Sequence, residues 1–210
     1  MSTSSLSTTF NSTNGKYYVQ CAGKTIETTV TKRGAAVSDW VRDIRSKHSG
    51  KSAVVVGLDR EWRPNTSPNA SNKTATLQLC VEEKCLIFQL LHADEIPDAL
   101  KRFMSDSTFA FVGVEVANDV GKLREEYGLA CGKSVDIAEL ARTKFPGKFN
   151  EQAVGLTSLV KEICGFDVAK PEDVRRSDWA AAELSSAQVQ YASIDAYASF
   201  RVGQSLLHGN

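Results

Sequence analysis

Two acidic residues that follow a continuously apolar segment have the types and the spacing of a cation site. Asp59 and Glu61 come directly after residues 53–58, an apolar run rich in β-branched residues that predicts a strand covered on both faces. Because side chains alternate along a strand, the two carboxylates share one face and Arg60 points to the other. Two such anions repel each other unless a cation joins them, and oxygen ligands select hard ions such as Mg²⁺ or Mn²⁺. The alternative is that both acids begin a loop and face water.

A third acid and a tyrosine–aspartate pair follow later in the chain, on segments that predict helices. Asp119 lies in the first turn of a helix expected over residues 119–127, where the helix dipole favours an acid even without a metal. Tyr191 and Asp195 are four residues apart in a helix expected over residues 185–207, so they share one face of it. An exposed aspartate beside a half-buried tyrosine is the alternative interpretation of that pair. Together, the four acids and the phenol are hard to explain by chance.

The chain divides into three segments by composition and periodicity. Residues 1–15 predict a disordered tail, residues 16–50 a β-hairpin and an amphipathic helix, and residues 51–208 the remaining domain. Within that domain strands come first and helices follow, which predicts a single α/β domain without a linker or an internal repeat. The expected strands are residues 53–58, 74–81, 85–90, 108–114 and 134–137, and the expected helices are residues 95–105, 119–127, 137–145, 154–164 and 185–207.

The charge balance excludes one class of function. The 210-residue chain has 25 basic and 25 acidic residues. Such a chain has no global positive field, so tight non-specific binding of nucleic acid is not expected. If the protein acts on nucleic acid, it does so at a local site that takes positive charge from metal ions.

Cysteine usage and hydropathy indicate the compartment. The five cysteines are scattered and include no C-x-x-C pair, which argues against a disulfide framework and against a zinc site. Neither a signal peptide nor an apolar run of membrane-spanning length is visible. We therefore expect reduced thiols in a cytoplasmic or nuclear protein without a membrane partner.

Three groups of residues carry a resemblance to a known family. The sequence resembles the DEDDy branch of the 3′-5′ exonucleases, and in particular the small plant proteins that consist of a Werner-syndrome-type exonuclease domain, such as the RISC-interacting clearing exoribonucleases. The resemblance covers residues 53–207. Its motifs are residues 56–64 and 75–80, residues 111–114 and 118–123, and residues 177–179, 184–185 and 188–197.

The resemblance implies a fold, a reaction and roles for the acidic residues. The fold would be RNase H-like, of the DnaQ-like exonuclease type, with a mixed central sheet flanked by helices and the hairpin as an N-terminal extension. Asp59, Glu61 and Asp195 would hold one Mg²⁺ or Mn²⁺ ion, and Asp59 with Asp119 a second. Tyr191 would orient the attacking water. The sister branch carries a histidine one residue before this tyrosine, where Gln190 stands here, so the tyrosine variant is the one that fits.

The expected substrate is a single-stranded or frayed 3′ end, with RNA somewhat favoured over DNA as in the plant relatives. We expect Trp62, Leu77, Lys122, Arg175 and Arg176 to contact it. Trp62 is either a core residue or a stacking surface for the terminal nucleotide. The two arginines are the best candidates for phosphate contacts, with Lys122 behind them, and a solvated charged loop is the alternative.

Glu115 is a departure from the family pattern, because relatives commonly carry glycine at this position. A bulky anion there would narrow the substrate channel or repel phosphate. Glu115 and the neutral charge favour one alternative function, a catalytically silent scaffold with the exonuclease fold. A DNA-repair exonuclease that acts with a separate helicase is a further alternative. A homo-oligomer, an RNA-silencing protein and a helicase are the partners that the resemblance suggests.

Overall fold

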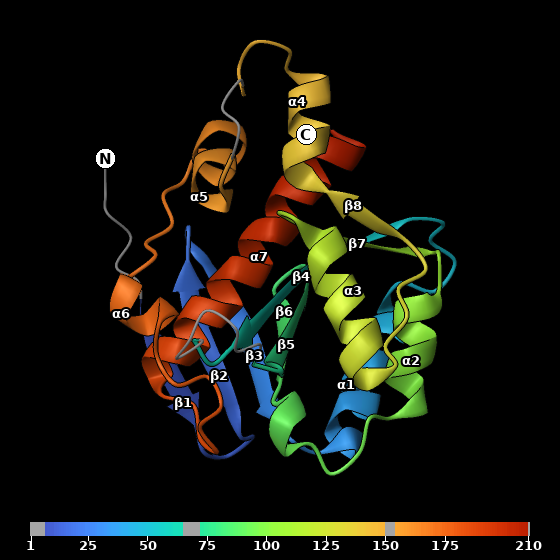
Figure 1. Ribbon diagram of the computed structural model, residues 1–210, viewed down its shortest axis with the longest axis vertical. Coiled ribbons are helices and arrows are strands. Elements are labelled where there is room, and N and C mark those ends of the chain that lie inside the picture. The colour runs from blue at the N-terminus through green and yellow to red at the C-terminus, as the bar shows by residue number, and fades with distance from the viewer. Residues whose placement is uncertain (1–6, 65–71, 150–153, 210) are drawn as a thin grey trace.

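The computed structural model describes residues 7–64, 72–149 and 154–209, and it contains one mixed eight-stranded sheet with helices on both sides (Figure 1). The strand order is β1-β2-β3-β6-β5-β4-β7-β8. The predicted mixed α/β sheet flanked by helices is confirmed. The strands are β1 (Thr8–Asn11), β2 (Lys16–Cys21), β3 (Lys24–Thr31), β4 (Val54–Trp62), β5 (Thr74–Val81), β6 (Lys84–Phe88), β7 (Phe109–Gly113) and β8 (Ser134–Asp136).

The N-terminal strands belong to the main sheet. The predicted hairpin is present as antiparallel β2 and β3, and β3 then pairs in parallel with β6. The prediction of a disordered tail over residues 1–15 is wrong for the described part, because β1 pairs antiparallel with β2 and the Phe10 and Tyr17 rings are 4.8 Å apart. Threonine and phenylalanine favour strands once a partner strand is available, which composition alone does not reveal. Residues 1–6 lie outside the described residues.

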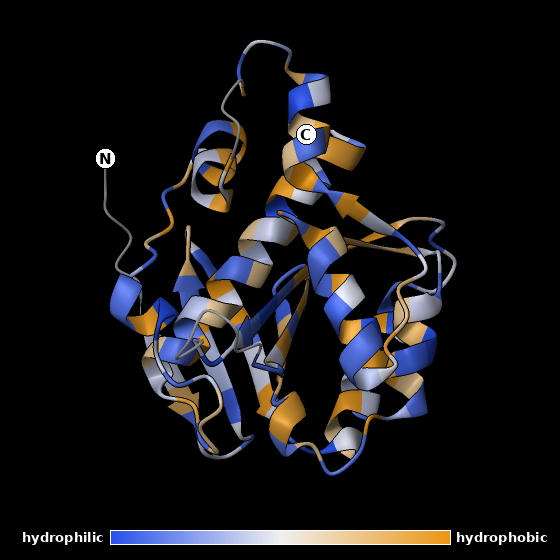
Figure 2. Cartoon of the chain, in the orientation of Figure 1, coloured by the Kyte–Doolittle hydropathy of each residue, from blue (hydrophilic) through white to orange (hydrophobic). Residues whose placement is uncertain are grey.

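The helices follow the predicted order with small shifts of their ends. One difference is a short helix after Pro171, in a stretch that lies outside the expected helices and strands. In Figure 2 orange and blue segments alternate along the helices, as expected of helices with one buried face. The helices are α1 (Gly34–Lys47), η1 (Leu90–His92), α2 (Asp98–Ser105), α3 (Val116–Tyr127), α4 (Ile137–Lys144), α5 (Leu156–Leu159), η2 (Val160–Cys164), α6 (Glu172–Arg175) and α7 (Ser186–His208).

The sheet separates two hydrophobic core regions, and α7 covers one of them. Val56 and Leu58 of β4 pack with residues of α1, α2 and α3, whereas Val55 packs with residues of α4, α5 and α7. In Figure 1, α7 runs diagonally across one face of the sheet. Among the described residues, no helix combines the length and the apolar composition that a bilayer crossing requires.

Candidate active site

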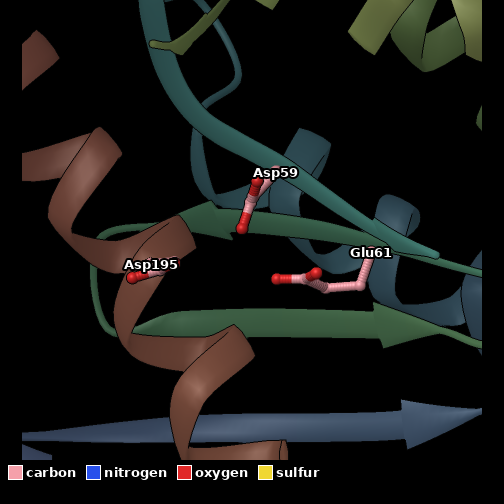
Figure 3. Close-up of side chains that lie close together, drawn as sticks. All are labelled: Asp59, Glu61 and Asp195. Atoms are coloured by element: carbon pink, nitrogen blue, oxygen red, sulfur yellow. The ribbon is translucent and has the colours of Figure 1, made fainter. Parts of the chain in front are cut away.

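Three carboxylates from distant parts of the sequence meet between β4 and α7. Asp59 and Glu61 come from the end of β4, and Asp195 comes from α7. One carboxylate oxygen of each lies within 4.8 Å of the others, and Figure 3 shows the three side chains around the same space. Glu61 is 9% exposed and Asp195 is 3% exposed. The expected proximity of Asp195 to the Asp59–Glu61 pair is confirmed.

The pleat of β4 decides which way its polar residues point. Val55 faces α7 and Leu58 faces α1 to α3, so alternation along the strand places Asp59 and Glu61 on the α7 face. The same alternation places Arg60 on the face toward α3. Pairing with β5 continues to the end of β4, so the strand geometry is maintained through both acids.

Two local features fix Asp195 against β4. A capping box begins α7, because the Ser185 hydroxyl accepts from the Gln188 backbone and the Gln188 side chain accepts from the Ser185 backbone. Gly57 allows the helix to come close, since a Cβ atom there would lie 2.0 Å from the Ala196 carbonyl oxygen. A larger residue at this position would separate Asp195 from the strand carboxylates.

Burial and crowding raise the pKa of all three carboxylates. Burial raises the pKa of Asp59 to about 8, and the charges of Asp195 and Asp119 add to the rise. The pKa of Glu61 rises to about 9, mainly through burial and then through the charge of Asp59. Burial also raises the pKa of Asp195, and Lys170 opposes that rise. Acids held this far from their ordinary range favour the binding of a cation.

A lysine already supplies positive charge to these carboxylates. Lys170 Nζ lies 2.7 Å from Asp195 Oδ2 and 5.6 Å from the centre of the Tyr191 ring. Burial lowers the pKa of Lys170, but Asp195 and Asp59 raise it by more, so the amine stays charged. Sequence analysis missed this residue, because Lys170 belongs to the irregular segment 165–171. A segment without periodicity gives no sign that its side chains contact α7.

Tyr191 borders the carboxylates one turn of α7 before Asp195. Its ring packs against Trp179, with 5.9 Å between the ring centres. Burial and then the charge of Asp195 raise the pKa of Tyr191 far above its ordinary value. The phenol therefore stays protonated at neutral pH, which suits a hydrogen-bonding role and not a role as a base.

Asp119 lies outside the group of three. Its Oδ1 atom accepts a hydrogen bond of 2.7 Å from Arg60 Nε, and Arg60 is its partner because the pleat turns that side chain toward α3. Burial raises the pKa of Asp119 to about 6, and Arg60 opposes that rise. The charge of Asp119 still acts on Asp59. We expected Asp119 to share an ion with Asp59, but in the structure its contact is with Arg60.

A cavity of about 340 Å³ lies beside Glu61, and Trp62, the predicted stacking residue, is part of its lining. Trp62 is 39% exposed, and it follows a register shift in the pairing of β4 with β5, between Glu61 and Trp62. The interpretation of Trp62 as a core residue is therefore wrong. The residues that line the cavity are Glu61, Trp62, Pro64, Arg175 and Arg176.

Among the other predicted substrate contacts, the two arginines lie beside Glu61, whereas Leu77 lies in the core. Arg175 and Arg176 line the cavity, and both guanidinium groups also pair with Glu172 at 2.6 Å. Leu77 is fully buried in the core on the α1 side of the sheet, which contradicts its expected contact with substrate. It lies in the middle of β5, where strands cover it on both sides. Lys122 pairs with Glu125 at 3.6 Å on α3.

Glu115 has a backbone conformation that explains why glycine was expected there. Its φ of 54° lies in the left-handed region, which glycine adopts without strain. Its backbone N–H donates a hydrogen bond of 2.7 Å to Asp136 Oδ2, which holds the start of α3. The side chain is exposed and lines a different cavity from that of Trp62.

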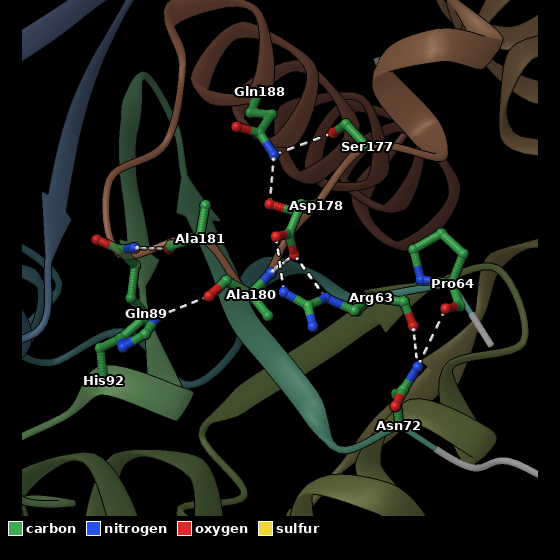
Figure 4. A network of polar contacts seen from close by, with 10 residues as sticks. All are labelled: Arg63, Pro64, Asn72, Gln89, His92, Ser177, Asp178, Ala180, Ala181 and Gln188. Atoms are coloured by element: carbon green, nitrogen blue, oxygen red, sulfur yellow. Dashed lines mark hydrogen bonds and ion pairs between the residues drawn. The ribbon is translucent and has the colours of Figure 1, made fainter. Parts of the chain in front are cut away.

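An ion pair that sequence analysis missed connects the two elements that carry the carboxylates (Figure 4). Arg63, just after β4, donates two hydrogen bonds of 2.8 and 2.7 Å to the Asp178 carboxylate. The Asp178 carbonyl in turn accepts from the Gln188 side chain in the first turn of α7. The two ionic side chains are 53% and 52% exposed, so their contribution to stability is modest. Their effect is to align β4 with α7.

Comparisons with known proteins identify the family of the chain. A family model described as 3′-5′ exonuclease matches residues 31–208. A 3′-5′ exonuclease of Arabidopsis thaliana is 33% identical over 176 residues, which are 83% of this chain and 60% of that protein. The bifunctional 3′-5′ exonuclease/ATP-dependent helicase WRN of Mus musculus is 31% identical over 153 residues, which are 72% of this chain and 11% of that protein. The chain thus spans less than two thirds of the length of these relatives.

Solved structures share the fold. The structure of RNase D from Escherichia coli, an exoribonuclease involved in structured RNA processing, has a TM-score of 0.71 with 19% identity, over 86% of this chain and 44% of that chain. The EXD2 exonuclease domain soaked in Mn has a TM-score of 0.51 with 26% identity, over 86% of this chain and 89% of that chain. At 19% identity the first likeness concerns the fold alone.

Proposed function

This chain belongs to the 3′-5′ exonuclease family, and from that premise we propose that it removes nucleotides from 3′ ends by metal-dependent hydrolysis. The observation that carries the proposal is the convergence of Asp59, Glu61 and Asp195 between β4 and α7. The raised pKa values of these acids support it, because burial and mutual repulsion disfavour the charged carboxylates and a bound divalent ion would offset both.

The donor set fits Mg²⁺ or Mn²⁺. The site offers carboxylate oxygens, which hard divalent ions prefer, and no cysteine or histidine belongs to the group among the described residues. Asp59, Glu61 and Asp195 would hold one ion, and Asp59 with Asp119 would hold a second. When bound, two such ions neutralise charge on the scissile phosphate and make water a stronger nucleophile.

The remaining residues would orient the reactants. The protonated Tyr191 phenol would hydrogen-bond the attacking water and aim it at phosphorus. Trp62 presents an exposed ring on which the terminal base would stack, and Arg175 and Arg176 on the same cavity would bind backbone phosphates. To bind a phosphate, the Arg175 guanidinium must leave the Glu172 carboxylate, to which it donates two hydrogen bonds. A phosphate can replace this carboxylate, because both anions accept paired hydrogen bonds from arginine.

The proposed substrates are single-stranded or frayed 3′ ends, with RNA somewhat favoured over DNA. The neutral chain supports recognition of an end at a local site over tracking along a duplex. The motif resemblance to small plant exoribonucleases supports RNA. Digestion of RNA and DNA strands of matched sequence, each with Mg²⁺ and with Mn²⁺, tests the preference. Faster loss of recessed DNA ends would favour the DNA-repair alternative.

A digestion assay tests the reaction itself. A 5′-labelled single strand should shorten stepwise from its 3′ end when Mn²⁺ is present, and Asp59→Asn should reduce the rate by at least about 10²-fold. Asp98→Asn is the matched control, because the Asp98 side chain is 74% exposed on α2 and pairs with Lys101 at 3.1 Å. Equal activity of the Asp59 variant and the control would refute the proposal.

A catalytically silent scaffold is the second candidate. The contact of Lys170 with Asp195 favours it, because a side-chain cation already neutralises part of the site. Calorimetric titration with Mn²⁺ separates the two candidates. An enzyme should take up Mn²⁺ in a manner that Asp59→Asn weakens, whereas a scaffold should show no such uptake.

A further inference from the structure

Arg60, the residue between the two strand carboxylates, makes three contacts on the α3 side of β4. Its Nε atom donates to Asp119 Oδ1 at 2.7 Å, and its Nη1 atom donates to Thr74 Oγ1 at 3.4 Å. Its guanidinium carbon lies 4.5 Å from the centre of the Trp62 ring. The side chains of Arg60 and Asp119 are 12% and 16% exposed. The guanidinium is thus enclosed by an acid, a hydroxyl and an indole.

This enclosure makes the pairing persistent. An exposed ion pair contributes little, but a partly buried pair with additional hydrogen bonds is costly to break, because each partner is left without compensation. Arginine is always charged, and its planar group is preorganised for carboxylates. Stacking on Trp62 further restricts the guanidinium. A divalent ion that approaches Asp119 therefore competes with a cation that is already bound.

We infer that Arg60 is the resident cation of Asp119 and that it restricts the second metal position of the site. Without nucleic acid, the chain takes up one divalent ion, at Asp59, Glu61 and Asp195. A second ion binds well only when Asp119 leaves Arg60. Arg60 is thus a positioning residue, acting through Asp119, and this inference rests on the proposed metal-dependent function.

Metal uptake at the three-carboxylate group and metal uptake at Asp119 can be changed independently. The group of three lies on the α7 face and has Lys170 as its neighbouring cation, whereas Asp119 has Arg60 on the α3 face. Removal of Arg60 should therefore change the second uptake and leave the first in place. This separation allows a test that counts ions and does not depend on catalysis.

Titration of the nucleic-acid-free protein with Mn²⁺, followed by calorimetry and by the electron paramagnetic resonance signal of free Mn²⁺, is the experiment. Wild type should bind one ion per chain, and Arg60→Met should bind two, with the second dissociation constant lowered at least about tenfold. Arg42→Met is the matched control, because Arg42 lies on α1, its side chain is 72% exposed and it pairs with Asp39. It should behave as wild type does.

Two further variants complete the experiment. Arg60→Met combined with Asp119→Asn should return to one ion per chain, which assigns the second uptake to Asp119. Arg60→Gln, which keeps a hydrogen-bond donor near Asp119, serves if the methionine variant does not fold. The first uptake, measured in the same titration, reports that the site is intact.

The outcomes distinguish this inference from the proposed function. One ion in wild type and in both Arg60 variants, or two ions of similar affinity in wild type, would overturn the inference alone. No uptake by wild type would overturn both. The expected ion counts together with a protein that degrades no nucleic acid would overturn the proposed reaction and uphold the role of Arg60.

Discussion

Two acids of the site, Asp195 and Asp119, are both paired with basic side chains at 2.7 Å, but the basic residues come from different kinds of backbone. Lys170 lies in the irregular segment 165–171, and its flexible stem reaches Asp195. Arg60 lies inside a paired strand and is also held by Thr74 and Trp62. The difference indicates that Lys170 can withdraw when a metal ion arrives, whereas Arg60 stays with its acid.

The largest expected effect compares the two acids directly. Asp195→Asn should weaken the first Mn²⁺ uptake by at least about 100-fold, because it removes a proposed ligand. Asp119→Asn should leave that uptake nearly unchanged, since Asp119 lies outside the group of three. Calorimetric titration of the two variants measures both values. Equal losses of Mn²⁺ affinity would show that the acids form one site, and the comparison would fail.

The pH dependence of stability distinguishes the Asp59–Glu61 pair from Asp119, because the pKa values of these acids are raised to different extents. In the folded metal-free chain burial raises the pKa of Asp59 to about 8, that of Glu61 to about 9 and that of Asp119 to about 6, against about 4 when unfolded. Because the folded pKa values are the higher ones, the stabilisation is present below about pH 4 and is lost as pH rises through the folded values. From pH 6 to pH 9 the unfolding midpoint should fall by roughly 4–8 °C, or about 2 kcal/mol, with saturating Mn²⁺ opposing the fall.

Thermal unfolding in a chelating buffer over this pH range is the measurement. The double variant Asp59→Asn and Glu61→Gln is the control, and its midpoint should change less between pH 6 and pH 9. A wild-type midpoint that rises over this interval would contradict the assigned pKa directions.

The smallest expected effect concerns Lys170. Lys170→Met should tighten the first Mn²⁺ uptake about tenfold, because the competing ammonium is gone, and should lower the metal-free unfolding free energy by about 1 kcal/mol. Lys170→Arg, which keeps the charge, is the control and should resemble wild type. If Lys170→Met instead weakens Mn²⁺ binding, the lysine supports the site and does not compete with metal.

Much of the fold could be predicted because periodicity reports burial. The continuously apolar residues 53–58 indicated a strand covered on both sides, and the long pattern over residues 185–207 indicated α7 nearly to its ends. β1 was missed because four residues rich in threonine become a strand only when β2 lies beside them. The helix Glu172–Arg175 was missed for a similar reason, since a single turn carries no periodic signal.

The sequence by itself determined the residue types and their alternation on β4, and hence that Asp59 and Glu61 share one face and Arg60 takes the other. It also determined that Tyr191 and Asp195 share a helix face. Only the tertiary structure decided which helix meets each face, and so which cation meets each acid. Asp195 meets Lys170 and Asp119 meets Arg60 because α7 and α3 pack on opposite sides of one strand, and contacts between segments so far apart in sequence leave no local signal.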